Sequence, residues 1–76
     1  MYTYNISKKA DQIAFKHACN LIENQIEKLK KEKLLTDVDG TEIQIYSAPD
    51  GKIKVFNDYE VDAVYVDSEV DLSSIF

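Results

Sequence analysis

The last part of the chain carries acidic residues at a regular spacing. From Asp58 to Phe76 there is no basic residue, and six carboxylates stand two residues apart in two runs of three: Asp58, Glu60, Asp62, Asp67, Glu69 and Asp71. Alternate side chains of a β-strand point to the same face, so this spacing predicts a strand face of carboxylates about 6.6 Å apart. Such a face repeats negative charge as a nucleic-acid strand does, and the chemistry that it offers is recognition of a basic surface.

Charge is unevenly distributed along the chain. Residues 1–36 contain seven lysines and four acidic residues, whereas residues 37–76 contain two lysines and ten acidic residues. The net charge is −5, the isoelectric point is near 4.6 and there is no arginine. Direct nucleic-acid binding is therefore disfavoured, because phosphate neutralisation needs a basic face. A partner protein that is itself basic fits this composition better.

We expect five of the carboxylates, with two aromatic residues beside them, to contact such a partner. These partner-binding residues are Glu60, Asp62, Asp67, Glu69, Asp71, Tyr46 and Phe56. Aromatic anchors supply much of the binding free energy in protein interfaces. The alternative is an ordinary hydrated face, in which Lys52 and Lys54 neutralise two of the six acids.

These features favour a small non-enzymatic inhibitor that blocks the basic nucleic-acid-binding surface of a partner enzyme. In size and charge the chain is similar to the small acidic proteins that viruses and mobile elements use against restriction systems, CRISPR nucleases and DNA-repair enzymes. A different class of function is also open. A homo-oligomer with a small-ligand pocket at the subunit interface would use the basic cluster Lys28, Lys30, Lys31 and Lys33 to hold an anion.

A short stretch in the middle of the chain suggests catalysis. Residues 34–41, with the sequence LLTDVDGT, resemble the first motif of haloacid-dehalogenase-like phosphatases, in which apolar residues precede DxDGT. The resemblance implies that Asp37 is the nucleophile and Asp39 the general acid and base. That family has a parallel Rossmann-like sheet in a domain about twice this size. An Asp-Gly turn explains the same residues, and we expect no enzymatic activity.

No metal or cofactor site is expected. His17 and Cys19 are two residues apart in a predicted helix and therefore point to different faces. A calcium loop that started at Asp37 would need glycine where Glu42 stands. Because there is one cysteine and no apolar stretch of signal-peptide or membrane-span length, we expect a soluble cytoplasmic protein without a membrane partner.

The first half of the chain is predicted to be mostly helical. From Ser7 to about Leu34 there is no glycine or proline, and apolar residues recur at helical spacing: Phe15, Cys19, Ile22, Ile26 and Leu29. This pattern predicts one long N-terminal helix. Its length would be about 40 Å, which is more than a small sheet covers. Its far end would therefore either project or pair with a second copy through Ile22, Ile26 and Leu29. The alternative is that this stripe lies against the sheet of its own chain.

Strands are predicted before and after the helix. Tyr2, Tyr4 and Ile6 alternate with polar residues, as in a short strand. The sequence Ala48-Pro49-Asp50-Gly51 predicts a β-hairpin with a three-residue loop. In that register the outward face holds Tyr46 and Phe56, and the core face holds Ile43, Ile45, Ile53 and Val55.

A further strand is expected from about Tyr59. The acids change parity between Asp62 and Asp67, which either a β-bulge at residues 63–66 or a turn at Asp67-Ser68 would explain. The predicted fold class is α+β, with one long N-terminal helix packed on a three- to four-stranded antiparallel sheet in a single domain, residues 1–76. A domain of this length buries only about 60% of its unfolded surface, so dimerisation is a natural supplement.

Overall fold

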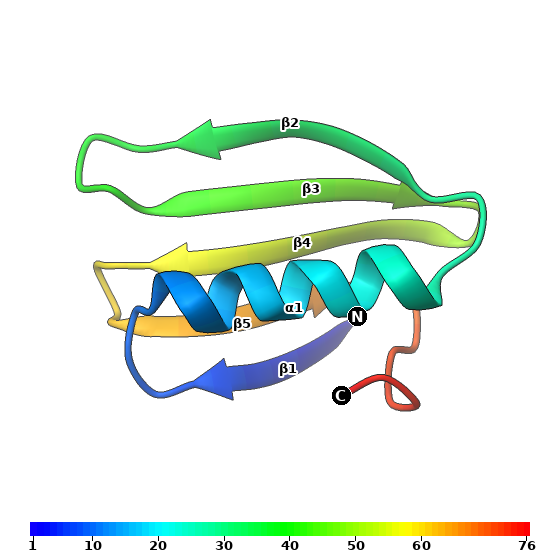
Figure 1. The fold of residues 1–76 in the computed structure, drawn as a ribbon, viewed down its shortest axis with the longest axis horizontal. Helices are drawn as coiled ribbons and strands as arrows, with labels where there is room; N and C mark the ends of the chain where they lie inside the picture. The colour runs from blue at the N-terminus through cyan, green and yellow to red at the C-terminus, as the bar shows by residue number, and fades with distance from the viewer.

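The computed structural model describes all 76 residues and contains one helix and five strands. In chain order these are β1 (Tyr2–Ser7), α1 (Gln12–Gln25), β2 (Lys30–Thr36), β3 (Glu42–Ala48), β4 (Gly51–Asp58) and β5 (Ala63–Ser68). The strands form one antiparallel sheet in the order β1-β5-β4-β3-β2. The helix crosses one face of this sheet and connects its two edge strands, β1 and β2 (Figure 1).

The predicted α+β class is confirmed, but the predicted long helix is wrong. The helix α1 has 14 residues and begins after Asp11, whose carboxylate accepts hydrogen bonds from the N–H groups of Ile13 at 2.8 Å and Ala14 at 3.4 Å. These contacts satisfy N–H groups that have no partner within the helix. The sheet has five strands rather than three or four, because β2 occupies the second half of the predicted helix. The helix α1 is neither long nor apolar enough to cross a membrane.

The edge strand β2 forms because its pairing with β3 outweighs local helix propensity. Lysine and glutamate favour a helix by only a few tenths of a kcal/mol over most residues, and tertiary pairing overrides so small a preference. Lys28, with a φ of 58°, lies in the loop where the chain reverses. A β-bulge between Lys31 and Leu34 interrupts the pairing with β3. The side-chain amide of Gln44 donates to the Glu32 carbonyl within this bulge at 2.6 Å.

The core lies between α1 and the sheet. Ten apolar side chains are buried there, from the helix, the three central strands and the C-terminal segment: Phe15, Ala18, Cys19, Ile22, Tyr46, Ile53, Val55, Val64, Val66 and Leu72. At one end the ring of Phe76 lies against Tyr4 of β1, with centroids 5.7 Å apart. Removal of this apolar surface from water is the main source of stability.

The apolar stripe of the predicted helix packs against the core of its own chain. Ile22 is fully buried against the sheet and is therefore unavailable to a second copy. Ile26 and Leu29 are half-buried and pack against the same core. The predicted dimer interface at these three residues depended on a projecting helix, and the helix ends at Gln25 instead.

The β3–β4 hairpin has a tighter loop than the sequence predicts. Ala48 pairs with Gly51, which leaves a loop of two residues and shifts the register by one. Such a shift moves every side chain of one strand to the other face. Tyr46 is therefore buried, and the expectation that it is exposed is wrong. The expectation that Ile43 and Ile45 lie in the core is wrong for the same reason.

The hydroxyl of the buried Tyr46 connects the helix to the sheet. It donates a hydrogen bond to Glu23 of α1 at 2.5 Å, and Glu23 also pairs with Lys31 of β2 at 3.3 Å. Burial, together with the hydrogen bond to Glu23, raises the pKa of Tyr46 well above its usual range. The phenol consequently stays protonated at physiological pH and keeps donating to the helix.

Tyr46→Phe removes this hydrogen bond with little change of shape. We expect it to lower the free energy of unfolding by about 1–2 kcal/mol, because a hydrogen bond to a charged group is lost while Glu23 keeps access to water. Equilibrium urea denaturation measures the loss. Tyr59→Phe is the matched control, because Tyr59 is exposed and its hydroxyl makes no hydrogen bond. Equal stability of Tyr46→Phe and the unsubstituted protein would contradict a role for this contact.

Candidate protein-binding surface

The six regularly spaced carboxylates do not share one strand face. Asp58 ends β4, Glu60 and Asp62 lie in the turn that follows, and Asp67 lies within β5. Glu69 and Asp71 follow β5, at the opposite end of the sheet (Figure 1). The expectation of a continuous acidic strand is wrong because residues 59–62 form a turn. This turn, rather than a bulge at residues 63–66 or a turn at residues 67–68, accounts for the change of parity.

Two turns that are distant in the sequence meet at one end of the sheet. The β2–β3 turn and the β4–β5 turn lie side by side there (Figure 1). The ring of Tyr59 lies against Gly40, with its Cδ2 atom 3.7 Å from the position that a Cβ would take. The Tyr59 N–H donates to the hydroxyl of Thr41 at 3.0 Å. We call the carboxylates of these two turns the acidic end; they are Asp37, Asp39, Asp58, Glu60 and Asp62.

Carboxylates of the β2–β3 turn hold their own backbone in place. Asp37 accepts a hydrogen bond from the Val38 N–H at 2.7 Å, and Asp39 accepts one from the Thr41 N–H at 2.9 Å. The hydrogen bonds from the backbone and the hydroxyl of Thr41 lower the pKa of Asp39. Asp39 is therefore ionised at neutral pH and fixes the turn at the same time.

The β4–β5 turn is fixed in the same manner. Asp58 accepts hydrogen bonds from the Glu60 N–H at 2.9 Å and from the Tyr65 hydroxyl at 3.0 Å. Asp62 accepts one from the N–H of Ala10, in the loop before α1, at 2.8 Å. The carboxylate of Glu60 makes no hydrogen bond within the chain. It is therefore the member of this turn that can contact a partner without loss of a structural contact.

No ammonium group pairs with the acidic end. Two ion pairs are present, and both involve other acids, Glu23 and Glu32. Lys8 and Lys9 lie in the β1–α1 loop at the same end of the sheet and form no ion pair. The five acids of the two turns outnumber these two lysines. This end of the molecule therefore keeps an excess of negative charge that is exposed to solvent.

Apolar side chains are exposed among these acids. Val38 is fully exposed, Val61 is 63% exposed and Tyr59 is 47% exposed. All three belong to the turns whose backbone the carboxylates hold in place. In protein interfaces, apolar anchors supply affinity while the surrounding charges supply steering and specificity. The acidic end therefore combines unpaired carboxylates with exposed apolar side chains.

Three other predicted contact residues lie away from the acidic end. Phe56 and Asp67 lie on the sheet face that α1 does not cover, and Asp67 accepts a hydrogen bond from the Thr3 hydroxyl at 2.8 Å. Tyr46 lies in the core. Of the predicted set, the structure brings together Glu60 and Asp62 and separates the other five residues from them.

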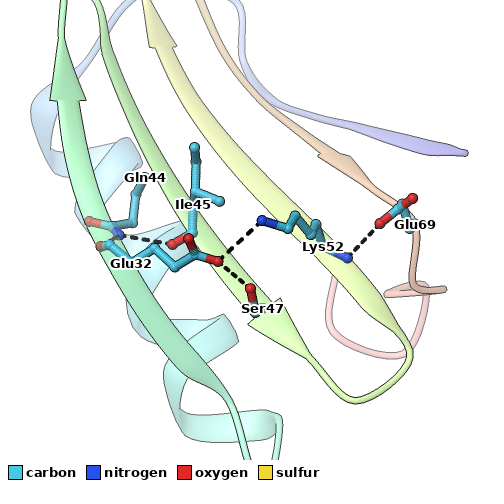
Figure 2. A network of polar contacts seen from close by, with 6 residues as sticks. All are labelled: Glu32, Gln44, Ile45, Ser47, Lys52 and Glu69. Atoms are coloured by element: carbon cyan, nitrogen blue, oxygen red, sulfur yellow. Dashed lines mark hydrogen bonds and ion pairs between the residues drawn. The ribbon is translucent and has the colours of Figure 1, made fainter.

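Glu69 belongs to a row of polar contacts at the other end of the sheet (Figure 2). Its carboxylate accepts a hydrogen bond from the N–H of Lys52 at 2.7 Å. The Lys52 ammonium and the Ser47 hydroxyl both donate to Glu32 of β2. The hydrogen bond from Ser47 lowers the pKa of Glu32. The row thus connects the edge strand β2 to β3 and β4. The Glu69 carboxylate already has a hydrogen-bond donor within the chain, the N–H of Lys52.

Asp71 fixes the C-terminal segment. It accepts hydrogen bonds from the Ser73 N–H at 2.9 Å and from the Tyr4 hydroxyl at 3.2 Å. The hydrogen bonds from Ser73 lower the pKa of Asp71. The Tyr4 hydroxyl also accepts a hydrogen bond from the Leu72 N–H at 2.7 Å, so these contacts hold the segment against β1.

The basic cluster that was expected to hold an anion does not converge on one point. Lys30, Lys31 and Lys33 lie along the edge strand β2, and Lys28 lies in the loop before it. Lys31 pairs with Glu23 of the helix. The other three ammonium groups have no ion pair and extend along this edge.

Sequence reasoning missed the contribution of the β2–β3 turn to the surface. The resemblance to the phosphatase motif pointed to Asp37 and Asp39 as catalytic residues and implied a parallel sheet. The structure instead places them after an edge strand of an antiparallel sheet. No three histidine, cysteine or carboxylate side chains converge in a way that could hold a metal ion. The sequence does contain a signal for this turn, because the apolar Val38 lies between two acids just before a turn-forming glycine. The structure shows that Val38 is fully exposed.

Comparisons with known proteins give no relative. No protein-family model matches the chain, and searches of curated proteins and of solved structures likewise find no match. The fold and the surface define a small α+β protein with an acidic, partly apolar end. Its function must therefore be inferred from its own residues.

The hydrogen bond between Asp58 and Tyr65 provides a test of the geometry of the β4–β5 turn. Burial, together with this hydrogen bond, raises the pKa of Tyr65 to about 12. An unfolded tyrosine titrates near pH 10, so the stability that this contact contributes is complete below about pH 10 and is lost as the pH rises towards the folded pKa. Absorbance titration of the phenolate is expected to show this late step, and Tyr65→Phe is expected to remove it.

Asp58→Asn is the matched variant for this titration. It removes the negative charge beside the phenol and is expected to lower the pKa of Tyr65. A Tyr65 that ionises at the pH of a free tyrosine in the unsubstituted protein would show that the turn does not hold Asp58 against it.

Proposed function

We propose that this protein binds a basic surface of a partner protein through its acidic end. The observation that carries the proposal is the meeting of two acidic turns around exposed apolar side chains, with no ammonium group paired to any of the five carboxylates. The charge attracts and orients a basic partner during encounter. The apolar groups Val38, Tyr59 and Val61 supply the area that is removed from water in the complex.

An enzyme that handles nucleic acid is the class of partner that fits this surface best. Its substrate groove is positively charged to neutralise phosphates, and an acidic protein seated there releases counterions as the nucleic acid would. The protein would then act as a non-enzymatic inhibitor, without a cofactor or metal and without binding nucleic acid itself. Anti-restriction and anti-CRISPR inhibitors from viruses act in this way, and we propose the same role here, in the cytoplasm of the host cell.

Glu60→Lys tests the proposal with little risk to the fold. Its carboxylate supports no structural contact, so the substitution changes the charge of the acidic end alone. The immobilised unsubstituted protein is expected to capture a basic nucleic-acid-binding protein from cell lysate, to be identified by mass spectrometry and then purified. Titration with this partner is expected to show an affinity at least about tenfold lower for Glu60→Lys, because a like charge then faces the basic surface.

Asp50→Lys is the matched control for this titration. It makes the same change of charge at an exposed position in the hairpin loop, at the opposite end of the sheet. Its affinity is expected to stay within about twofold of the unsubstituted protein. Competing DNA and added salt are both expected to release the partner. Equal affinity of Glu60→Lys and Asp50→Lys, or capture that neither DNA nor salt weakens, would contradict the proposal.

A further inference from the structure

The sheet face opposite α1, here called the open face, carries a row of apolar side chains. The cross-strand pairs Leu35–Ile43, Ile43–Phe56 and Phe56–Tyr65 place these residues next to one another across four strands. The rings of Phe56 and Tyr65 are stacked with centroids 4.7 Å apart. Ile45 lies beside the row on the same strand as Ile43. None of these side chains belongs to the core between the helix and the sheet, and all remain partly exposed.

Strand β4 carries opposite charges on the two sides of this row. Lys54 precedes Phe56 by two residues and Asp58 follows it by two, so the three side chains point to the open face. The hydrogen bond between Asp58 and the Tyr65 hydroxyl confirms that the carboxylate lies on this side of the sheet. The order along the strand is therefore a cation, an aromatic ring and an anion.

We propose that a second copy of this chain covers the open face, so that two sheets pack face to face in a dimer. Consider a two-fold axis that lies in the interface above Phe56 and runs across the strands. This axis places Phe56 opposite the partner's Phe56. It also places Lys54 of each copy opposite Asp58 of the other copy, which makes two charged pairs. The charge pattern of β4 is therefore complementary to itself, and the apolar rows of the two copies meet between the charged pairs.

The size of the open face suits a stable dimer. The molecule measures 31 × 23 × 21 Å, and the sheet spans the two longer dimensions (Figure 1). A rectangle of these two dimensions encloses about 700 Å², which sets the upper size of the face and is comparable to the roughly 800 Å² that each partner buries in a standard interface. Side chains of packed sheets interdigitate across a spacing of about 10 Å, so the row would become a second core.

The same axis keeps the most negative regions of the two copies apart. Each chain has a net charge of −5, and repulsion between two such chains opposes association. Because the axis runs across the strands, it reverses the strand direction of the second copy. The two acidic ends then point away from each other. Asp58 faces the partner's Lys54, and the other four carboxylates of each acidic end stay exposed in the dimer.

Mass measurement in solution tests the dimer, with sedimentation equilibrium of the full chain as the readout. The unsubstituted protein is expected to have twice the mass of its 8.7 kDa chain at micromolar concentration. Lys54→Glu and Asp58→Lys each place like charges in contact and are expected to weaken self-association at least about tenfold. An equimolar mixture of the two variants is expected to restore the dimer, because every charged pair is then opposite in sign.

Ile45→Glu provides a second, independent variant, because Asp58→Lys also removes hydrogen bonds of the β4–β5 turn. Ile45 lies outside the core, so the variant is expected to fold, as judged by thermal denaturation, and to be monomeric. Val38→Glu makes the same kind of change at the acidic end and is expected to remain dimeric.

Three results would overturn the proposal. One is a mass of 8.7 kDa for the unsubstituted protein at every concentration up to millimolar. Another is a dimer that persists unchanged in Lys54→Glu and Ile45→Glu, since the interface would then lie elsewhere. The third is a monomer whose binding to a captured partner protein is lost in Ile45→Glu, which would assign the open face to that partner.

Discussion

The two-residue loop between β3 and β4 determines which side chains face the helix. With Ala48 opposite Gly51, Tyr46 enters the core and reaches Glu23 of the helix. The same register places Ile43 beside Phe56 on the uncovered face, where both contribute to the apolar row. A shift of one residue would exchange the two faces of β3, leaving Tyr46 exposed and moving Ile43 and Ile45 to the helix side. The core, the attachment of the helix and the composition of the open face all depend on this one geometric constraint.

The molecule has two exposed surfaces of different physical character. The acidic end consists of turns in which carboxylates hold the backbone and form no ion pair, so its interactions are long-ranged and sensitive to salt. The open face is a row of apolar side chains flanked by one cation and one anion on β4. Its interactions would be short-ranged and would depend on complementary shape. One helix covers only one face of a five-stranded sheet, which leaves the second surface available.

Local signals in the sequence predicted part of this arrangement. The first half of the helix, the β3–β4 hairpin and the concentration of acids towards the C-terminus follow from apolar spacing, turn residues and composition. The strand β2 could not be predicted, because residues 30–36 favour a helix locally and form a strand only by pairing with β3. The contact between Tyr59 and Gly40 is likewise non-local, since it depends on the order of strands in the sheet. The acidic end therefore became visible only in three dimensions.

Carboxylate footprinting of the complex with a captured partner tests the role of the acidic end most directly. A water-soluble carbodiimide labels exposed carboxylates, and mass spectrometry locates each label in the free and the bound protein. Binding is predicted to protect Asp37, Asp39 and Glu60 while Glu69 and Asp71 are labelled as in the free protein. Protection of Glu69 and Asp71 with unchanged labelling of the two acidic turns would contradict binding through this end of the sheet.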